Sequence, residues 1–134
     1  MIDRDLFFGR VRASVFNGSM NQEQVDGCNT ILDEWEDRAL TDLRQLGYML
    51  GTGLWETART MQPIEEYGHG AGHPYGVPAP ETKKVYYGRG YVQLTWRSNY
   101  ETMGKLLDVP LVYEPERALE PAVAAAILFE GMTR

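Results

Sequence analysis

Apolar residues recur with helical spacing in five stretches of the chain, and this spacing is lost between residues 61 and 90. The first stretch covers residues 6–16 and precedes Asn17-Gly18, where a glycine just beyond the last turn is typical of a helix end. The second carries an apolar stripe that reaches Trp35, with acidic side chains on its other face. Two capping boxes could begin it, either Ser19 with Gln22 or Asn21 with Gln24.

The third stretch leads from Thr41, a candidate N-cap, to Trp55 and Glu56 at its end. Glycine lacks a Cβ, so glycines on a helix let another backbone come close. Three of them predict such an approach here: Gly47, Gly51 and Gly53.

The last two stretches follow the loop. In the fourth, Ser98 and Glu101 form a further capping box, and the helix should end before Pro110. The fifth begins at Pro121, which suits a first helical turn, and its residues 122–132 are apolar nearly all round, so we expect it to be buried. The pattern predicts a mainly α fold that forms one domain over residues 1–134.

Residues 61–90 hold four of the seven prolines and six of the fourteen glycines, together with several tyrosines. No helix persists through so many breakers, so we expect a long loop or a small hairpin. Its aromatic content indicates an ordered segment, of the kind that lines a cleft.

Composition narrows the possible partners. The 134 residues carry a formal net charge of −6, a sequence pI of about 4.9 and 43% hydrophobic side chains. Such a chain can bury a single core, which excludes intrinsic disorder, and its acidity without a Lys/Arg cluster argues against nucleic acid. Its apolar stretches are too short for stable membrane insertion. Residues 1–12 lack the apolar core of a secretory signal, so we expect synthesis in the cytoplasm.

Cysteine and histidine suggest no cofactor and no metal. The single Cys28 cannot form an internal disulfide and implies no redox framework. His69 and His73 have the spacing of a helical metal pair, but the glycines and proline around them exclude a helix, and no third ligand is near. We interpret them as loop histidines.

Three glutamates are candidates for acid–base chemistry: Glu56, Glu65 and Glu66. Glu56 follows an apolar helix end, where a carboxyl group kept from water would be suited to act as a general acid. The alternative left open is that Glu56 pairs with Arg59 or Arg89 and only stabilises the turn.

Residues 86–100 are dense in tyrosines and in neutral side chains that both donate and accept hydrogen bonds. Sugars are bound by such surfaces, because their hydroxyls need two-way hydrogen bonding while their C–H faces stack on aromatic rings. A turn and strand whose tyrosines simply pack is the alternative.

Two segments resemble the signature of family 19 glycoside hydrolases, the lysozyme-like α-helical chitinases. Residues 86–101, YYGRGYVQLTWRSNYE, match its Tyr-Tyr-Gly-Arg-Gly start, its Gln-Leu-Ser/Thr centre and its Asn-Tyr end. Residues 53–68, GLWETARTMQPIEEYG, are similar to the segment that carries His-Glu-Thr in phage and prophage members. Residues 21–36 and 114–132 are also similar to those phage proteins, so the resemblance covers nearly the whole chain.

The resemblance implies a role for each matching residue. Glu56 would be the general acid that protonates the leaving glycosidic oxygen, and Glu66, with Glu65 as the second choice, the base that activates water. Thr95 would help to hold this water, and Arg89 would order carboxylates beside the cleft. The other residues assigned to the substrate cleft are Tyr87, Gln93, Asn99 and Tyr100. The family inverts the anomeric centre, which requires carboxyl groups about 6.5–9.5 Å apart.

Two departures from the family pattern concern the cleft. Trp55 stands where the family commonly has His, and we expect its ring to lie against Glu56 in the cleft and to shield that carboxyl from water. The alternative is that Trp55 is a core residue that faces away from the cleft. Phage relatives usually continue beyond the last helix, so a far cleft wall partly absent from this sequence is also expected.

The expected function is that of an endo-acting, inverting hydrolase of the endolysin, lysozyme or chitinase type. It would cleave β-1,4 bonds of N-acetylglucosamine polymers as a monomer without cofactor. Peptidoglycan is favoured over chitin, because neither a signal nor a chitin-binding module is present; it would be reached during phage lysis or through a secretion device. Two alternatives remain open: a non-catalytic or weakly active glycan-binding protein on the same fold, and an inhibitor or immunity-like partner that uses the acidic face of the second helix.

Overall fold

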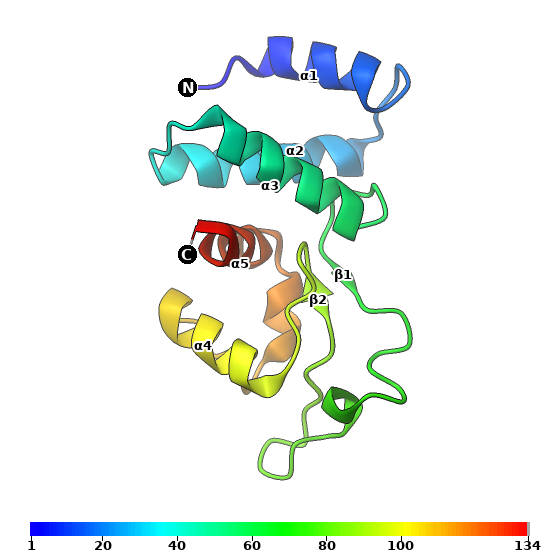
Figure 1. Cartoon of the computed structure of the whole chain (residues 1–134), viewed down its shortest axis with the longest axis vertical. Coiled ribbons are helices and arrows are strands. Elements are labelled where there is room, and N and C mark those ends of the chain that lie inside the picture. Colours follow the sequence, from blue (N-terminus) through cyan, green and yellow to red (C-terminus); the bar gives the residue numbers. More distant parts are fainter. Residues whose placement is uncertain (134) are drawn as a thin grey trace.

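The computed structural model describes residues 1–133 and is mainly helical, as predicted. Its helices are α1 (Arg4–Ser14), α2 (Gln22–Asp37), α3 (Leu43–Glu56), α4 (Arg97–Leu107) and α5 (Pro121–Thr133). Two short 3-10 helices, η1 (Pro74–Gly76) and η2 (Pro115–Leu119), lie in the connections. Figure 1 shows α1 at one end of the molecule, α2 and α3 next to it, α5 in the middle and α4 towards the other end.

The starts of α2 and α3 show how local chemistry sets helix boundaries. Of the two predicted capping boxes, the one at Asn21 and Gln24 forms, with hydrogen bonds of 2.8 and 2.9 Å in the two directions. α3 is capped by Asp42 and not by the predicted Thr41. A carboxylate is favoured at this position, because it accepts an unpaired backbone N–H and carries a charge opposite to that of the helix N-terminus.

The start of α4 differs from the prediction. The helix begins at Arg97 after Trp96, which has a positive φ of 74° and provides no side-chain cap. The capping box expected of Ser98 and Glu101 is therefore wrong, because Ser98 already lies within the first turn. Glu101 instead pairs with Lys105 at 3.2 Å on the outside of the helix.

Two clusters of buried side chains are joined by α5. The larger cluster packs α2 and α3 against α5, and the smaller one packs α4 and η2 against it. Leu128 and Phe129 of α5 belong to the first cluster and Ile127 to the second, so α5 is buried on several sides as predicted. α1 has no buried residue and lies on the outside of the first cluster. Within residues 1–133, no helix combines the length and the hydropathy needed to cross a bilayer.

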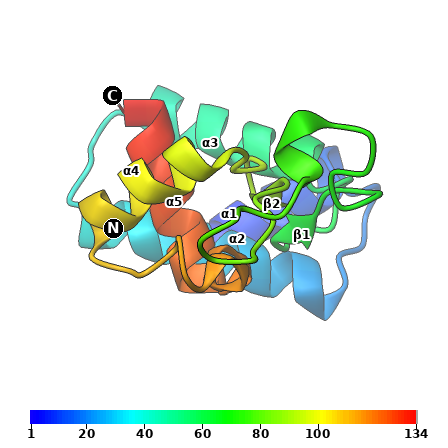
Figure 2. The same ribbon diagram turned by 90° about the horizontal axis from the view of Figure 1, so that it is seen from below.

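A two-stranded antiparallel ladder closes the long loop. Strand β1 (Ile64–Glu65) pairs with β2 (Arg89–Gly90), so that Glu65 lies opposite Arg89. The predicted long loop and the predicted small hairpin are thus one structure, a loop of residues 66–88 held at its base by two short strands. Figure 2 shows the first part of this loop, around η1, at the opposite side of the molecule from the N-terminus.

The close backbone approach predicted for the glycines of α3 is absent there, within the described residues, and occurs instead at Gly27 of α2. A Cβ added there would lie 1.8 Å from the carbonyl oxygen of Met61. At Gly47 and Gly51 it would meet nothing within 4 Å, and at Gly53 only side-chain atoms, the nearest at 3.3 Å. Helical spacing shows which glycines share a face, but not which face meets another segment.

Candidate active site

Glu56 is the last residue of α3, where a sharp turn redirects the chain. Thr57 anchors this turn, because its buried hydroxyl donates to the Gly53 carbonyl at 2.6 Å and accepts the Met61 N–H at 3.0 Å. The Glu56 side chain is exposed, and within residues 1–133 no hydrogen bond or ion pair holds its carboxylate. This carboxyl group is therefore free to meet a ligand, but it is not buried as the sequence suggested.

Neither arginine that could have paired with Glu56 does so. Arg59 donates a hydrogen bond to the Val15 carbonyl, and its guanidinium lies 5.5 Å from the centre of the Phe16 ring. It therefore joins the end of α3 to the residues after α1. Arg89 is buried elsewhere, so the purely structural pairing considered for Glu56 is wrong.

Trp55 precedes Glu56 but does not shield it. Trp55 is 83% exposed, and the neighbouring Glu56 is exposed as well. The expectation that this ring lies against Glu56 and excludes water is wrong, because both side chains at the end of α3 reach solvent. Trp55 lines a hollow of about 520 Å³ together with Gly51, Leu54, Ala58 and Arg59.

Glu66 is engaged on both carboxylate oxygens. Oε1 accepts the Gly88 N–H at 3.0 Å, and Oε2 accepts the Gly70 N–H at 3.1 Å and the Tyr75 hydroxyl at 3.0 Å. Burial alone would raise the pKa of Glu66, but these three hydrogen bonds and the nearby His73 together lower it. Glu66 thus ties the two sides of the loop together and has little capacity left to take a proton from water.

Glu65, the preceding residue, is the more available carboxylate. Its side chain is 40% exposed, and its Oε2 accepts a hydrogen bond from the Tyr87 hydroxyl and lies 3.4 Å from Nε2 of His69. Within the described chain, Oε1 of Glu65 makes no such contact. Of the two adjacent glutamates, Glu65 is thus the more exposed and has one oxygen without a hydrogen bond or ion pair in the described chain, whereas both oxygens of Glu66 accept hydrogen bonds.

Arg89 and Tyr100, expected in the substrate cleft, are instead buried, with 6% and 0% exposure. The Arg89 guanidinium donates to the Tyr100 hydroxyl at 3.0 Å and the Val85 carbonyl at 3.1 Å, and it lies 3.8 Å from the centre of the Tyr87 ring. Burial raises the pKa of Tyr100 to about 12, so its hydroxyl stays a donor. In residues 1–133 no carboxylate pairs with Arg89, so it does not order carboxylates directly but supports Tyr87.

Gln93, Thr95 and Asn99 shape the turn that follows β2. Gln93 has a positive φ of 54°, and its side-chain amide donates to the carbonyls of Ile64 at 3.0 Å and Gly90 at 3.1 Å. The Thr95 hydroxyl donates to the Gln93 carbonyl, and the Asn99 amide donates to the Thr95 carbonyl, each at 2.9 Å. The Gln93 amide thus joins β1 to β2 beside Glu65, whereas Thr95 and Asn99 stabilise the turn that follows.

Sequence reasoning missed the parts played by Thr57, His69 and Tyr75. The two loop histidines do not face a common ion: His69 stacks on Tyr87 with ring centres 4.8 Å apart, and His73 stacks on Tyr75 at 5.0 Å. Only the interleaving of tyrosine and histidine in the loop hinted at these stacks. Within residues 1–133, no group of three or more His, Cys, Asp or Glu side chains is arranged to hold a metal ion.

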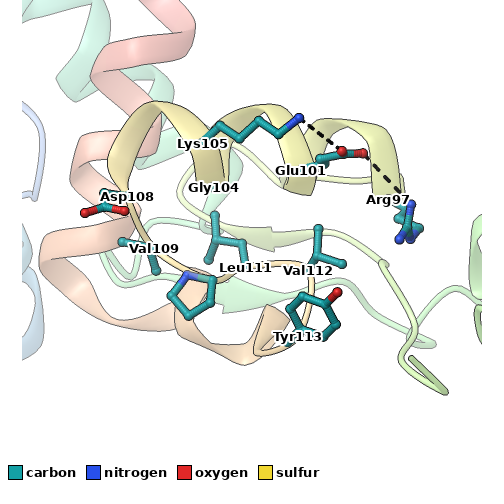
Figure 3. A pocket seen from close by; sticks show the side chains of 10 residues that line it. Arg97, Glu101, Gly104, Lys105, Asp108, Val109, Leu111, Val112 and Tyr113 are labelled. Atoms are coloured by element: carbon teal, nitrogen blue, oxygen red, sulfur yellow. Dashed lines mark ion pairs between the residues drawn. The ribbon is translucent and has the colours of Figure 1, made fainter. Parts of the chain in front are cut away.

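A separate hollow of about 410 Å³ lies between α4 and residues 108–113 (Figure 3). Glu101 is joined to Arg97 and Lys105 by ion pairs along α4, and the ring of Tyr113 lies across from that helix. None of the predicted site residues lines this hollow. It is therefore not part of the site formed by the glutamates.

The fold is the lysozyme-like helical fold that the sequence resemblance implied, and solved structures of chitinases share it. Chitinase C from Streptomyces griseus superimposes with a TM-score of 0.56 and 25% identity, over 78% of this chain and 55% of that one. A bacterial family 19 chitinase gives a TM-score of 0.56 and 28% identity, over 78% and 56% of the two chains.

Relatives with local sequence similarity to this chain are also chitinases. Two endochitinases of Arabidopsis thaliana are 50% identical to this chain over 42 residues, and the endochitinase CHI of the same plant is 48% identical. These residues are 31% of this chain and 15% of each relative. No family model matches the chain. The resemblance to family 19 glycoside hydrolases is thus confirmed. This chain spans about half the length of the solved chitinases that it matches.

Proposed function

We propose that this protein is a glycoside hydrolase that cleaves β-1,4 bonds between N-acetylglucosamine units of chitin-type glycans. The observation that carries the proposal is the pair of available carboxylates, Glu56 at the end of α3 and Glu65 on β1. Both are exposed, and both lie in the segment that resembles chitinases. The chitinases among its relatives support this class of substrate.

Glu56 and Glu65 would divide the work of an inverting hydrolase. Glu56 in its acid form gives its proton to the glycosidic oxygen while the bond from that oxygen to the anomeric carbon breaks. Glu65 takes a proton from a water molecule, whose oxygen forms the new bond on the opposite face of the sugar. Proton exchange with solvent then restores both groups, and the net reaction adds one water.

Glu65 is chosen over its neighbour because of the state of its oxygens. A base needs a lone pair that faces water, and Oε1 of Glu65 has no hydrogen bond or ion pair in the described chain. Glu66, by contrast, accepts three hydrogen bonds. Three other residues remain candidates to bind substrate or the attacking water: Tyr87, Gln93 and Thr95.

Peptidoglycan is the second substrate to consider, because it contains the same N-acetylglucosamine unit. The similarity of residues 21–36 and 114–132 to phage proteins favours it. If it is the natural substrate, the setting we propose is attack on the cell wall during phage lysis. Turbidity loss of purified peptidoglycan, measured beside hydrolysis of a soluble chitin oligomer, separates the two.

The proposal is tested with Glu56→Gln, which removes the proton donor and should lower the rate of chitin-oligomer hydrolysis by about 10²–10⁴-fold. Glu116→Gln is the matched control, because Glu116 is an exposed glutamate on η2 outside this site. Proton NMR of the first product should show the α-anomer. A wild-type rate in Glu56→Gln would reject Glu56 as the acid, and an initial β-anomer would reject inversion. Glycan binding by wild type without hydrolysis would point to the non-catalytic alternative.

A further inference from the structure

Two side chains hold the same oxygen of Glu65. Oε2 accepts the hydrogen bond from the Tyr87 hydroxyl and also lies 3.4 Å from Nε2 of His69. The rings of His69 and Tyr87 are themselves stacked, with centres 4.8 Å apart and planes 17° from parallel. The carboxylate is thus held at one end, while Oε1 has no hydrogen bond or ion pair within the described chain.

The Tyr87 ring is fixed from the protein interior. The guanidinium of Arg89 lies 3.8 Å from the ring centre, is buried, and leaves its Nε without a hydrogen-bond partner in the described chain. Burial and the hydrogen bond to Glu65 raise the pKa of the Tyr87 hydroxyl, so it remains a proton donor at neutral pH. A cation this close to the ring face favours one position of the ring.

His69 has a left-handed backbone conformation within the loop. Its φ is 51°, between Gly68 at 85° and Gly70 at 80°, and its N–H donates to the Glu66 carbonyl at 3.1 Å. A residue other than glycine pays a conformational cost in this left-handed region, and such strain gathers at functional sites. Glycine would be the favoured residue if only the turn mattered.

We propose that His69 is a positioning residue for Glu65, which it orients together with Tyr87 by holding Oε2. This inference rests on the proposed function, in which Glu65 is the base. With Oε2 held, the carboxylate has restricted rotation, and Oε1 is the oxygen left to accept the proton from water. Orientation of a catalytic group acts on the rate of the chemical step and not on substrate binding.

The loop contains a matched control. His73 stacks on Tyr75 with ring centres 5.0 Å apart, and the Tyr75 hydroxyl donates to Glu66 at 3.0 Å. This second group is also a histidine–tyrosine stack whose tyrosine donates to a glutamate, but no ion pair joins His73 to Glu66 in the described chain. It differs in serving a carboxylate that is saturated with hydrogen bonds, so it should matter for loop stability and little for the chemical step.

The experiment measures kcat and KM on a soluble chitin oligomer for the full chain and its variants. We expect His69→Ala to lower kcat by about 3–10-fold, the size of one exposed contact to a charged group, with KM changed less than about twofold. His69→Gln keeps an N–H donor and should recover part of the loss. His73→Gln should change kcat by less than about twofold.

Two further variants distinguish positioning from folding. Glycine adopts the left-handed backbone without cost, so His69→Gly removes the ring while favouring the turn. Equal losses of kcat in His69→Gly and His69→Ala would show that the ring is what matters. In the Glu65→Ala background, with formate added as an external base, His69→Ala should have no further effect, because no tethered carboxylate remains to be oriented.

The outcomes separate this inference from the function on which it rests. If Glu65→Ala hydrolyses as fast as wild type, Glu65 is not the base, and the role of His69 falls with that assignment while the hydrolase activity stands. If wild type itself does not hydrolyse the oligomer, the proposed function fails. If Glu65→Ala is inactive but His69→Ala has the kcat of wild type, only the role of His69 is refuted. The role of His69 is also refuted if His69→Ala lowers the formate-supported rate of Glu65→Ala as strongly as it lowers the kcat of wild type. It is refuted as well if His73→Gln lowers kcat as much as His69→Ala.

Discussion

Replacing Glu66 by glutamine tests the assignment of the two adjacent glutamates most directly. In the structure, Oε1 of Glu66 accepts one hydrogen bond, from Gly88, and Oε2 accepts two, from Gly70 and Tyr75. The amide of glutamine has only one acceptor oxygen, and its nitrogen is a donor. In either orientation, at least one of the three donors must therefore face an NH2 group.

The expected cost follows from this count. With the amide nitrogen towards Gly88, one backbone donor loses its partner, and the two other hydrogen bonds lose the help of a charge. One unsatisfied donor costs about 1–3 kcal/mol when buried, and partial access of water to this site favours the lower half of that range. Glu66→Gln should thus lower the free energy of unfolding by about 1–2 kcal/mol. Activity of the folded fraction should be retained.

The assay is urea unfolding at several pH values, beside kcat on a soluble chitin oligomer. Because the pKa of Glu66 is lowered in the folded state, its ionised form stabilises the protein above the unfolded-state pKa of about 4.3. This contribution is lost as the pH falls through the folded-state pKa, so wild type and Glu66→Gln should become equally stable in acid.

Glu65→Gln is the matched comparison and should show the reverse pattern, with activity lost and stability little changed. A Glu66→Gln protein that is as stable as wild type at pH 7 but inactive would refute the reasoning and return the role of base to Glu66. A stability difference that persists unchanged in acid would show that the charge of Glu66 is not what holds the loop.

Two further predictions concern the helical core. Gly51→Ala should raise the free energy of unfolding by about 0.5–1 kcal/mol, because a Cβ meets nothing within 4 Å there and alanine favours the helix. Gly27→Ala should lower the free energy of unfolding by about 2–4 kcal/mol, because a Cβ would lie 1.8 Å from the Met61 oxygen. Both are measured by urea unfolding, and a Gly27→Ala protein as stable as wild type would contradict the packing described. Burial raises the pKa of Cys28 to about 11, so at pH 8 the native thiol should react with a disulfide reagent about 10²-fold or more slowly than the urea-unfolded one. Equal rates in the two states would show that Cys28 is not buried.

The order of the helices could be read from the sequence because the signals are local. Amphipathic spacing, the box at Asn21 and Gln24, and Pro121 at a first turn act within a few residues, and the structure has helices where they indicated them. The capping of α4 could not be read in this way. Its first turn is set by the turn after β2 and by the positive φ of Trp96, not by the pattern of Ser98 and Glu101.

The chemistry of the site shows the same division. The sequence by itself determined the helical class, the ordered loop, the resemblance to chitinases and the identity of the candidate carboxylates, since each depends on residue types at short spacing. Tertiary structure alone decided that Glu56 is exposed, that Arg89 lies beneath Tyr87, and that Glu65 and Glu66 have different surroundings. Neighbouring side chains on a strand point to opposite faces, so which of two adjacent glutamates meets solvent depends on the strand's partner. That partner, β2, and Tyr87, 22 positions from Glu65, are distant in sequence, and only folding brings them together.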